Sequence, residues 1–390
     1  MIKVIANVNA TIADEHTKGI YIFDLEEKRR NPLTYMPTHL LTEINGERTT
    51  PLYSKIFSSG NQSLLTFMTK DRLLCCDFNE IAEKKGTFEF NELKIKENCS
   101  LENVVKKLEL SIDDPLSKIV ESKEKNLGGS IEILNGNLYW QIHRNLLLGN
   151  EGIKMIAFNN FFSEKSLLNL SLLDFNSSEF NPTMEIKSLN DELLLACHNS
   201  FHYGNNGFQT ESGISTFDTY DNLIAIADFS SNYYLLHNNE RIAKGDLDEY
   251  AQSVAIGKYG GEYNIIYGHS DGFITLQKFN PETNQSSMKK INLYQSLYQS
   301  IKKMNPDNLD NNNDSDDKGD SDLDLLEKIE SEQRKIKHLK ITPDGKVFFS
   351  IKRFIPYFRL EDANDNIIEL RDYFLTAHRT QHFDIHYKVQ

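Results

Sequence analysis

The amino-acid sequence predicts an all-β fold, a β-propeller of seven four-stranded blades with short helical insertions. Short apolar or alternating runs are separated by turns that contain Gly, Asn, Asp or Pro, which is typical of many short strands. These runs fall into groups of four. The groups recur about every 50 residues once insertions are discounted, which is a period within the range of propeller blades.

Two kinds of strand are expected. Residues 87–91 and 381–389 alternate with period two, with aromatic and aliphatic residues on one face. Residues 192–197 and 222–227 are apolar almost throughout, as strands that are buried on both faces are. The sequence therefore predicts that most strands lie between other layers of sheet.

The clearest group of four spans residues 51–95. Its predicted strands are 52–58, 64–68, 72–78 and 87–93. Comparable groups lie at 130–173, 184–211, 214–245, 251–294 and 336–371, and a further group begins with 2–9 and 19–26. The weak boundaries of the third and fourth groups leave six or eight blades open.

The two ends of the chain are predicted to meet in one blade. Residues 2–9 and 19–25 have the character of a second and a third strand, so the first blade lacks its innermost strand. The alternating run 381–389 can supply it, and this pairing would remove an open sheet edge. One domain over residues 1–390 follows.

Several turns carry a family resemblance. Residues 267–276 (YGHSDGFITL) resemble the hairpin between two strands of a WD40 (WD-repeat) blade, and residues 339–348 (LKITPDGKVF) are similar to that family's Pro-Asp-Gly turn. Residues 19–25 and 74–78 lie where the family has its Trp-Asp strand. The Trp-Asp pair itself is never intact, because Gln277-Lys278 replaces it in one blade and Trp140 precedes Gln141. The chain thus resembles a degenerate WD40-like propeller, which implies a scaffold that binds other proteins.

Two segments depart from the strand pattern. Residues 100–126 place Leu101, Val104 and Leu108 on one helical face, and this helical insertion is expected either to pack on the propeller or to bind a partner. Residues 306–336 form an acidic insertion. Its first part has little to bury and is expected to be disordered, and a capping box at residues 321–324 then predicts a helix.

The charge is uneven. The chain has a net charge of -14, and residues 307–332 contain eleven acidic residues against Lys318 and Lys328. An acidic chain without a basic stripe argues against a nucleic-acid partner. No apolar run is long enough to span a membrane, and the N-terminus lacks the features of a signal peptide. The four cysteines form no CxxC pair, which favours a reducing, cytoplasmic location, and a closed propeller is expected to be monomeric.

Sequence motifs for catalysis or cofactors are absent. The sequence contains no GxSxG elbow, Walker loop, HExxH or dinucleotide-binding GxGxxG, so no catalytic residue and no cofactor is predicted. His382, Asp384 and His386 alternate along the last strand and are therefore expected on one face. They are weak candidate metal ligands, and a polar strand face is the plainer interpretation.

Five residues are candidates for binding a partner. His198, His202 and Tyr203 precede a Gly-Asn-rich loop and are expected where inner strands emerge onto one face of the propeller. His269 and Asp271 fall in a comparable turn. For these two, the WD40 resemblance implies an Asp or His that hydrogen-bonds within its own blade.

The leading functional hypothesis is a protein-protein interaction platform, a scaffold or adaptor that binds another protein or peptide through loops of a propeller face. An enzyme with a hydrolase-type site in the central channel is the alternative, and convergent acidic or basic side chains there would favour it. A bacterial effector that targets host proteins is a third possibility.

Overall fold

In the computed structural model, described residues occur along the whole chain. They are 2–8, 19–25, 34–35, 39–41, 43–44, 47–48, 53–59, 62–68, 72–79, 95–100, 106, 109, 131–142, 153–158, 170–175, 183–197, 199–203, 206–283, 285–304, 322–330, 334–376 and 380–387.

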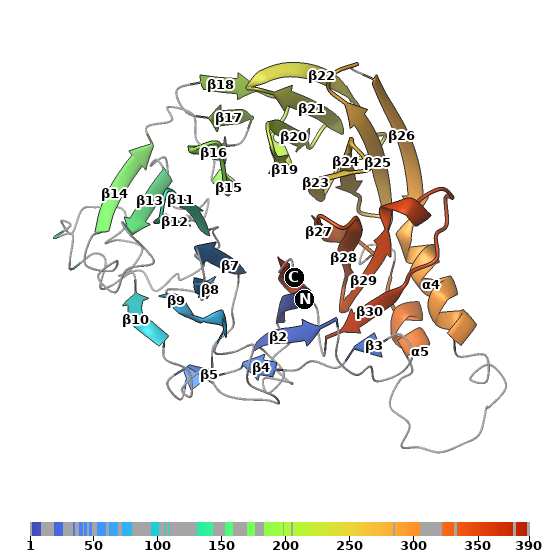
Figure 1. Ribbon diagram of the computed structural model, residues 1–390, viewed down its shortest axis with the longest axis horizontal. Coiled ribbons are helices and arrows are strands. Elements are labelled where there is room, and N and C mark those ends of the chain that lie inside the picture. Colours follow the sequence, from blue (N-terminus) through green and yellow to red (C-terminus); the bar gives the residue numbers. More distant parts are fainter. Residues whose placement is uncertain are drawn as a thin grey trace.

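The chain forms a β-propeller whose sheets surround a common centre (Figure 1). Strands β7, β15, β19, β23 and β27 lie toward the centre, and β10, β14, β18, β22 and β26 lie at the rim. Three four-stranded sheets come from the first half of the chain: β31 (Thr380–Tyr387), β1 (Ile2–Val8), β2 (Gly19–Asp24) and β4 (His39–Leu41); β7 (Tyr53–Ser59), β8 (Gln62–Met68), β9 (Arg72–Asp77) and β10 (Ile95–Ser100); β11 (Ile131–Leu134), β12 (Asn137–Ile142), β13 (Ile153–Phe158) and β14 (Leu170–Phe175).

The other sheets follow in chain order. Three are four-stranded: β15 (Thr183–Leu189), β16 (Glu192–Cys197), β17 (Ser200–Tyr203) and β18 (Asn206–Gln209); β19 (Ile214–Tyr220), β20 (Leu223–Asp228), β21 (Asn232–His237) and β22 (Glu240–Asp246); β23 (Ser253–Tyr259), β24 (Glu262–Gly268), β25 (Phe273–Asn280) and β26 (Gln285–Asn292). One five-stranded sheet contains β27 (Ile336–Ile341), β28 (Lys346–Ile351), β29 (Phe354–Arg359), β30 (Asp372–Leu375) and β3 (Thr34–Tyr35). A short pair, β5 (Glu43–Ile44) and β6 (Glu47–Arg48), completes the described strands.

The two chain ends pair as the sequence predicts. Strand β31 runs antiparallel to β1, with Ile2 opposite Tyr387 and Ala6 opposite Phe383. The last strand therefore becomes the innermost strand of the first sheet, and both ends lie near the centre in Figure 1. This pairing confirms the predicted closure.

The fourth strand of the second sheet differs from the prediction. The fourth strand of the second sheet is β10, at Ile95–Ser100, and the predicted stretch 87–93 lies outside the described residues. A rim strand pairs on one side only, so its side-chain alternation constrains its position less than that of a central strand. Ser100 ends this strand. Of the predicted 100–126 helical insertion beyond it, the described part consists of Lys106 and Glu109.

Helix α4 (Leu293–Met304) was not predicted, because helices were expected only in the insertions at 100–126 and 306–336. Its signal is present in the sequence: Leu293, Leu297 and Ile301 recur every four residues and are all buried. Helix α5 (Asp322–Glu327) falls within the 306–336 insertion and buries Leu323 and Leu326, whereas residues 305–321 lie outside the described residues.

The core lies between neighbouring sheets. One cluster joins the β19–β22 sheet to the β23–β26 sheet through Leu235, Ile265 and Tyr267. A second joins the β23–β26 sheet to the β27–β30 sheet and to α4 and α5. Among the described residues, the helices are all too short or too polar to cross a membrane.

Candidate functional site

Charged side chains of the innermost strands meet around the central axis. Lys55 Nζ on β7 lies 2.5 Å from Glu132 Oε2 on β11, and Lys187 Nζ on β15 lies 2.5 Å from Asp218 Oδ1 on β19. Lys340 Nζ on β27 lies 3.6 Å from Asp384 Oδ1 on β31. Each pair joins two sheets, and three lysines balance three carboxylates.

Two of these carboxylates also accept a backbone hydrogen bond from the following sheet. Asp218 Oδ2 accepts from Ile256 N at 2.9 Å, and Asp384 Oδ2 accepts from Ile56 N at 3.2 Å. Burial by itself raises the pKa of Asp218. The charges of Lys187 and Lys340 and these hydrogen bonds outweigh burial, so the pKa lies below its usual range.

These central charges bear on the enzyme hypothesis. Acidic and basic side chains do converge at the centre, but each of the three carboxylates is within ion-pair distance of a lysine ammonium. A glycosidase-type or aspartic-protease-type pair requires one carboxyl group whose pKa is raised. Asp218 has the opposite shift, which suits a structural ion pair better than a general acid.

The three candidate metal ligands do lie on one face of β31, as their alternation predicts. The His382 ring stacks on Tyr53 with centroids 4.1 Å apart, Asp384 binds Ile56 N, and His386 packs edge-on against Phe78 at 4.9 Å. Burial lowers the pKa of His382 well below its ordinary value, and the charge of His338 lowers it further. Over the part of the chain that the structure describes, no three His, Cys, Asp or Glu residues are grouped as metal ligands would be.

The candidate partner-binding residues of the β15–β18 sheet differ in their exposure to solvent. His198 lies outside the described residues. His202 lies partly exposed on β17. Tyr203 is buried, and its hydroxyl donates to the backbone oxygen of Asn239, in the next sheet, at 2.8 Å. Tyr203 therefore joins two sheets.

His269 and Asp271 both bond within their own sheet. His269 is fully buried, and its Nε2 shares a hydrogen bond of 2.8 Å with the Thr275 hydroxyl. Burial lowers the pKa of this imidazole. Asp271 Oδ1 accepts from Phe273 N at 3.2 Å and so fixes the turn. These contacts are of the in-blade kind that the WD40 resemblance implies.

A different part of the molecule carries an exposed aromatic side chain. In the β19–β22 and β23–β26 sheets, the turn between the second and third strands forms backbone hydrogen bonds with segments that connect sheets. We call the surface formed by residues 210–213, 228–231, 246–252 and 268–272 the connection face. Its backbone bonds include Phe229 N to Gly213 O at 2.9 Å and Leu247 N to Ser231 O at 2.8 Å.

Asp228 fixes the turn that presents Phe229. This carboxylate is fully buried and accepts from Ser230 N and Asn232 N, both at 2.9 Å, and from the Tyr234 hydroxyl at 3.0 Å. The side chain of Phe229 nevertheless remains 53% exposed, the largest fraction among the large hydrophobic side chains of the described residues. A rigid backbone thus holds an apolar ring in solvent.

Tyr250 lies beside this ring. The two ring centroids are 5.9 Å apart and the planes are inclined by 52°. Gln252 Nε2 donates to the Tyr250 hydroxyl at 2.6 Å, which restrains the second ring. Neither ring was among the predicted partner-binding residues, although an aromatic residue in a predicted turn, where burial is not expected, was an available signal.

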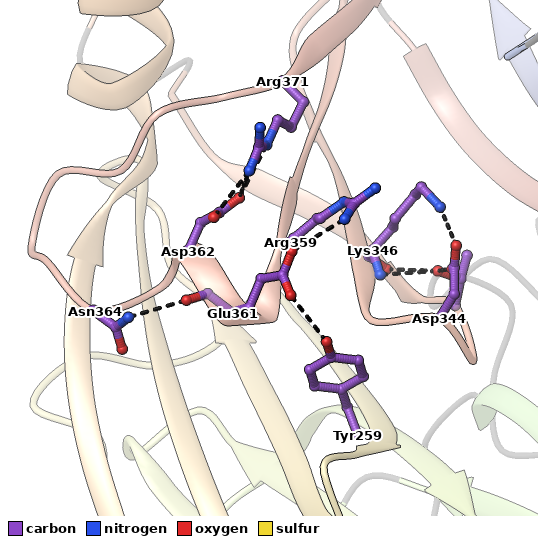
Figure 2. Close-up of polar contacts among 9 residues, drawn as sticks. Tyr259, Asp344, Lys346, Arg359, Glu361, Asp362, Asn364 and Arg371 are labelled. Carbon is purple, nitrogen blue, oxygen red and sulfur yellow. Dashed lines mark hydrogen bonds and ion pairs between the residues drawn. The ribbon is translucent and has the colours of Figure 1, made fainter.

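At the strand ends opposite the connection face, charged side chains form a network of ion pairs (Figure 2). Glu361 accepts from Arg359 at 3.1 Å and from the Tyr259 hydroxyl at 3.2 Å, and the Arg359 hydrogen bond lowers the pKa of Glu361. Arg371 binds both carboxylate oxygens of Asp362. Since these charges neutralise one another, the network is suited to holding residues 360–371 against the β23–β26 sheet.

No protein-family model and no curated protein matches the sequence. Among solved structures, a chain from the crystal structure of the mitotic checkpoint complex is similar over 87% of this chain and 83% of its own, with a TM-score of 0.51 and 7% identity. The computationally designed Ika8 protein aligns over 97% of this chain and 88% of its own, with a TM-score of 0.47 and 9% identity. At 7% identity, the likeness to the chain from the mitotic checkpoint complex shows the fold alone.

Proposed function

We propose that this protein is an interaction platform, a WD40-like scaffold or adaptor that binds another protein or peptide through loops of one propeller face. The proposal depends on the position of Phe229. The buried carboxylate of Asp228 binds the backbone N–H groups of Ser230 and Asn232, and Phe229 N donates to Gly213 O. These bonds hold the Phe229 side chain in solvent on the connection face. Exposed aromatic residues on rigid surfaces are the usual anchors of protein interfaces.

Membership of the WD40-like family is part of the proposal. It is supported by the in-sheet bond of His269 to Thr275 and by the Asp-Gly turns at Gly272 and Gly345, whose φ angles are +88° and +79°. A side chain at Gly345 would also meet the ring of Tyr259 at 2.6 Å. Glycine is therefore required at this turn for two reasons.

We also propose seven blades. The five-stranded sheet counts as the seventh, because its extra strand, β3, adds only two residues in parallel to β30. A cytoplasmic location accords with the four cysteines of the sequence, which form no CxxC pair. The similar solved chain comes from a multi-protein complex, so at least one protein of this fold takes part in an assembly.

The test is to capture partners with the tagged full-length protein and to quantify them by mass spectrometry. The F229A variant and a variant that lacks residues 306–320 are tested in parallel. We expect a reproducible partner in stoichiometric amount whose recovery falls at least fivefold with F229A and is retained by the deletion. The platform proposal fails if no partner exceeds the background of an unrelated propeller. Turnover of simple ester, phosphoester or glycoside substrates by a partner-free protein would favour the enzyme hypothesis.

A further inference from the structure

The aromatic pair of the connection face lies in acidic surroundings. The four segments that form this face contain six acidic residues and no Lys or Arg, namely Glu211, Asp228, Asp246, Asp248, Glu249 and Asp271. Asp228 is buried and fully bonded, whereas Glu211, Asp246 and Asp248 are exposed. The exposed carboxylates give this surface a negative potential.

Three basic groups near this face contact other groups. Lys290, whose charge helps to lower the pKa of His269, lies with its Nζ 4.9 Å from the centroid of the Phe273 ring. Lys244 forms an ion pair with Glu211. Arg334, which borders Gly272, lies with its guanidinium carbon 4.0 Å from the centroid of the Tyr294 ring. None of these three residues forms an ion pair with the carboxylates at 246–249.

The bonds within the acidic segment leave its charge in place. Asp246 Oδ1 accepts from Asp248 N at 2.8 Å, and Glu249 Oε1 accepts from the Ser270 hydroxyl at 2.6 Å. Both donors are neutral. The segment is anchored at Leu247, whose side chain is buried and whose N–H bonds to Ser231 O, so the aromatic and acidic parts of the surface form one fixed unit.

From this arrangement we propose that the surface formed by Phe229, Tyr250, Asp248 and Glu249 binds a Lys or Arg side chain carried on an exposed segment of the partner protein. The inference rests on the proposed platform function and specifies its partner. The faces of aromatic rings attract cations, and nearby carboxylates both steer a basic segment toward the surface and disfavour acidic or phosphate-bearing ligands. A second copy of this chain is a poorer occupant, because its net charge is -14.

The test uses a displayed library of random twelve-residue peptides, selected on the immobilised full-length protein. Fluorescence anisotropy then measures the binding of individual peptides. We expect enrichment of Lys and Arg, and we expect replacement of the enriched basic residue by Gln to weaken binding at least tenfold. F229A and Y250A should each weaken it at least fivefold. D248N/E249Q should weaken it and reduce its dependence on salt, because fewer charges are then screened.

The matched control is M288A, which removes another exposed hydrophobic side chain, 41% exposed, on rim strand β26. It should leave peptide binding unchanged, and circular dichroism should show the native fold in every variant. Selected peptides that lack basic residues, or that bind F229A as well as the wild type, would overturn this inference while leaving the platform proposal intact. If no peptide is enriched over a blank support, this inference fails, whereas the platform proposal is decided separately by the capture of partner proteins. Self-association through this surface in place of peptide binding would also overturn the inference.

Discussion

The carboxylate of Asp384, on the last strand, accepts a hydrogen bond from the backbone N–H of Ile56, 328 residues earlier in the chain. The same carboxylate lies 3.6 Å from Lys340 Nζ, so one side chain joins the innermost strands of three sheets. Asp218 repeats this arrangement with Lys187 and Ile256 N. Two equivalent carboxylates thus stabilise the ring at two places.

Asp384→Ala should lower the free energy of unfolding by about 2 kcal/mol. The change leaves the partly buried backbone N–H of Ile56 without its acceptor and the partly exposed Lys340 without its counter-charge. Urea denaturation followed by fluorescence measures the loss. Asp384→Asn, which keeps an acceptor oxygen, should lose less than the alanine variant, and equal losses for the two variants would contradict the role of the backbone bond.

Asp218 should make stability depend on acid. Its pKa is lower in the folded protein than in the unfolded chain, so the unfolded chain binds more protons as the pH falls below about 4. The contribution of Asp218 is therefore present above that pH and is lost as the pH falls through the folded pKa. The difference in unfolding free energy between wild type and Asp218→Asn should be constant from pH 6 to 8 and should shrink below pH 4. A difference that does not change with pH would refute the assignment.

Tyr234 should make the stability of the fold depend on pH under alkaline conditions. Burial, together with the hydrogen bond to Asp228, raises its pKa to about 12, above the ordinary value of 10.0. The folded state therefore holds the phenol proton longer than the unfolded state, and this part of the stability is lost as the pH rises from 10 to 12. Tyr234→Phe should show a smaller loss than the wild type in this window. A phenolate absorbance titration that includes Tyr234 near pH 10 would count against the prediction.

His269 should make the fold sensitive to mild acid. Burial lowers its pKa below 6.5, so the unfolded chain takes up a proton first and stability falls as the pH decreases below 6.5. His269→Gln should reduce this slope in urea denaturation between pH 7 and 5. The control is Thr275→Val, which removes the hydroxyl partner but keeps the imidazole. It should lower stability at every pH while retaining the slope, and loss of the slope in Thr275→Val would contradict this account.

The features of the fold that could be predicted from the sequence are those that depend on residues close together in the chain. Strand groups such as 214–245 and the hairpin at 342–345 were predicted closely, because apolar runs and Asp-Gly turns are encoded in adjacent residues. The rim strand β10 was misplaced, since a strand with one partner carries a weak pattern. Helix α4 was missed where a four-residue apolar spacing followed directly on a strand.

The candidate site was less accessible from the sequence. Tyr203 and His269 were selected as residue types that bind partners, yet the structure buries both in contacts between or within sheets. Phe229 was not selected. Its exposure depends on the buried Asp228 and on the backbone bond to Gly213, and neither contact can be predicted from a single sequence.

The sequence by itself determined the all-β class, the grouping of strands in fours, the Gly-dependent turns and the pairing of the first and last strands, because each depends on periodicity or on the conformational limits of neighbouring residues. Only the tertiary structure decided which charges neutralise one another. Lys55 and Glu132 are 77 residues apart, and Ile56 and Asp384 are 328 apart. Closure of the sheets around one axis brings these groups together, and the same closure leaves Phe229 exposed beside the half-buried Tyr250 on an acidic face.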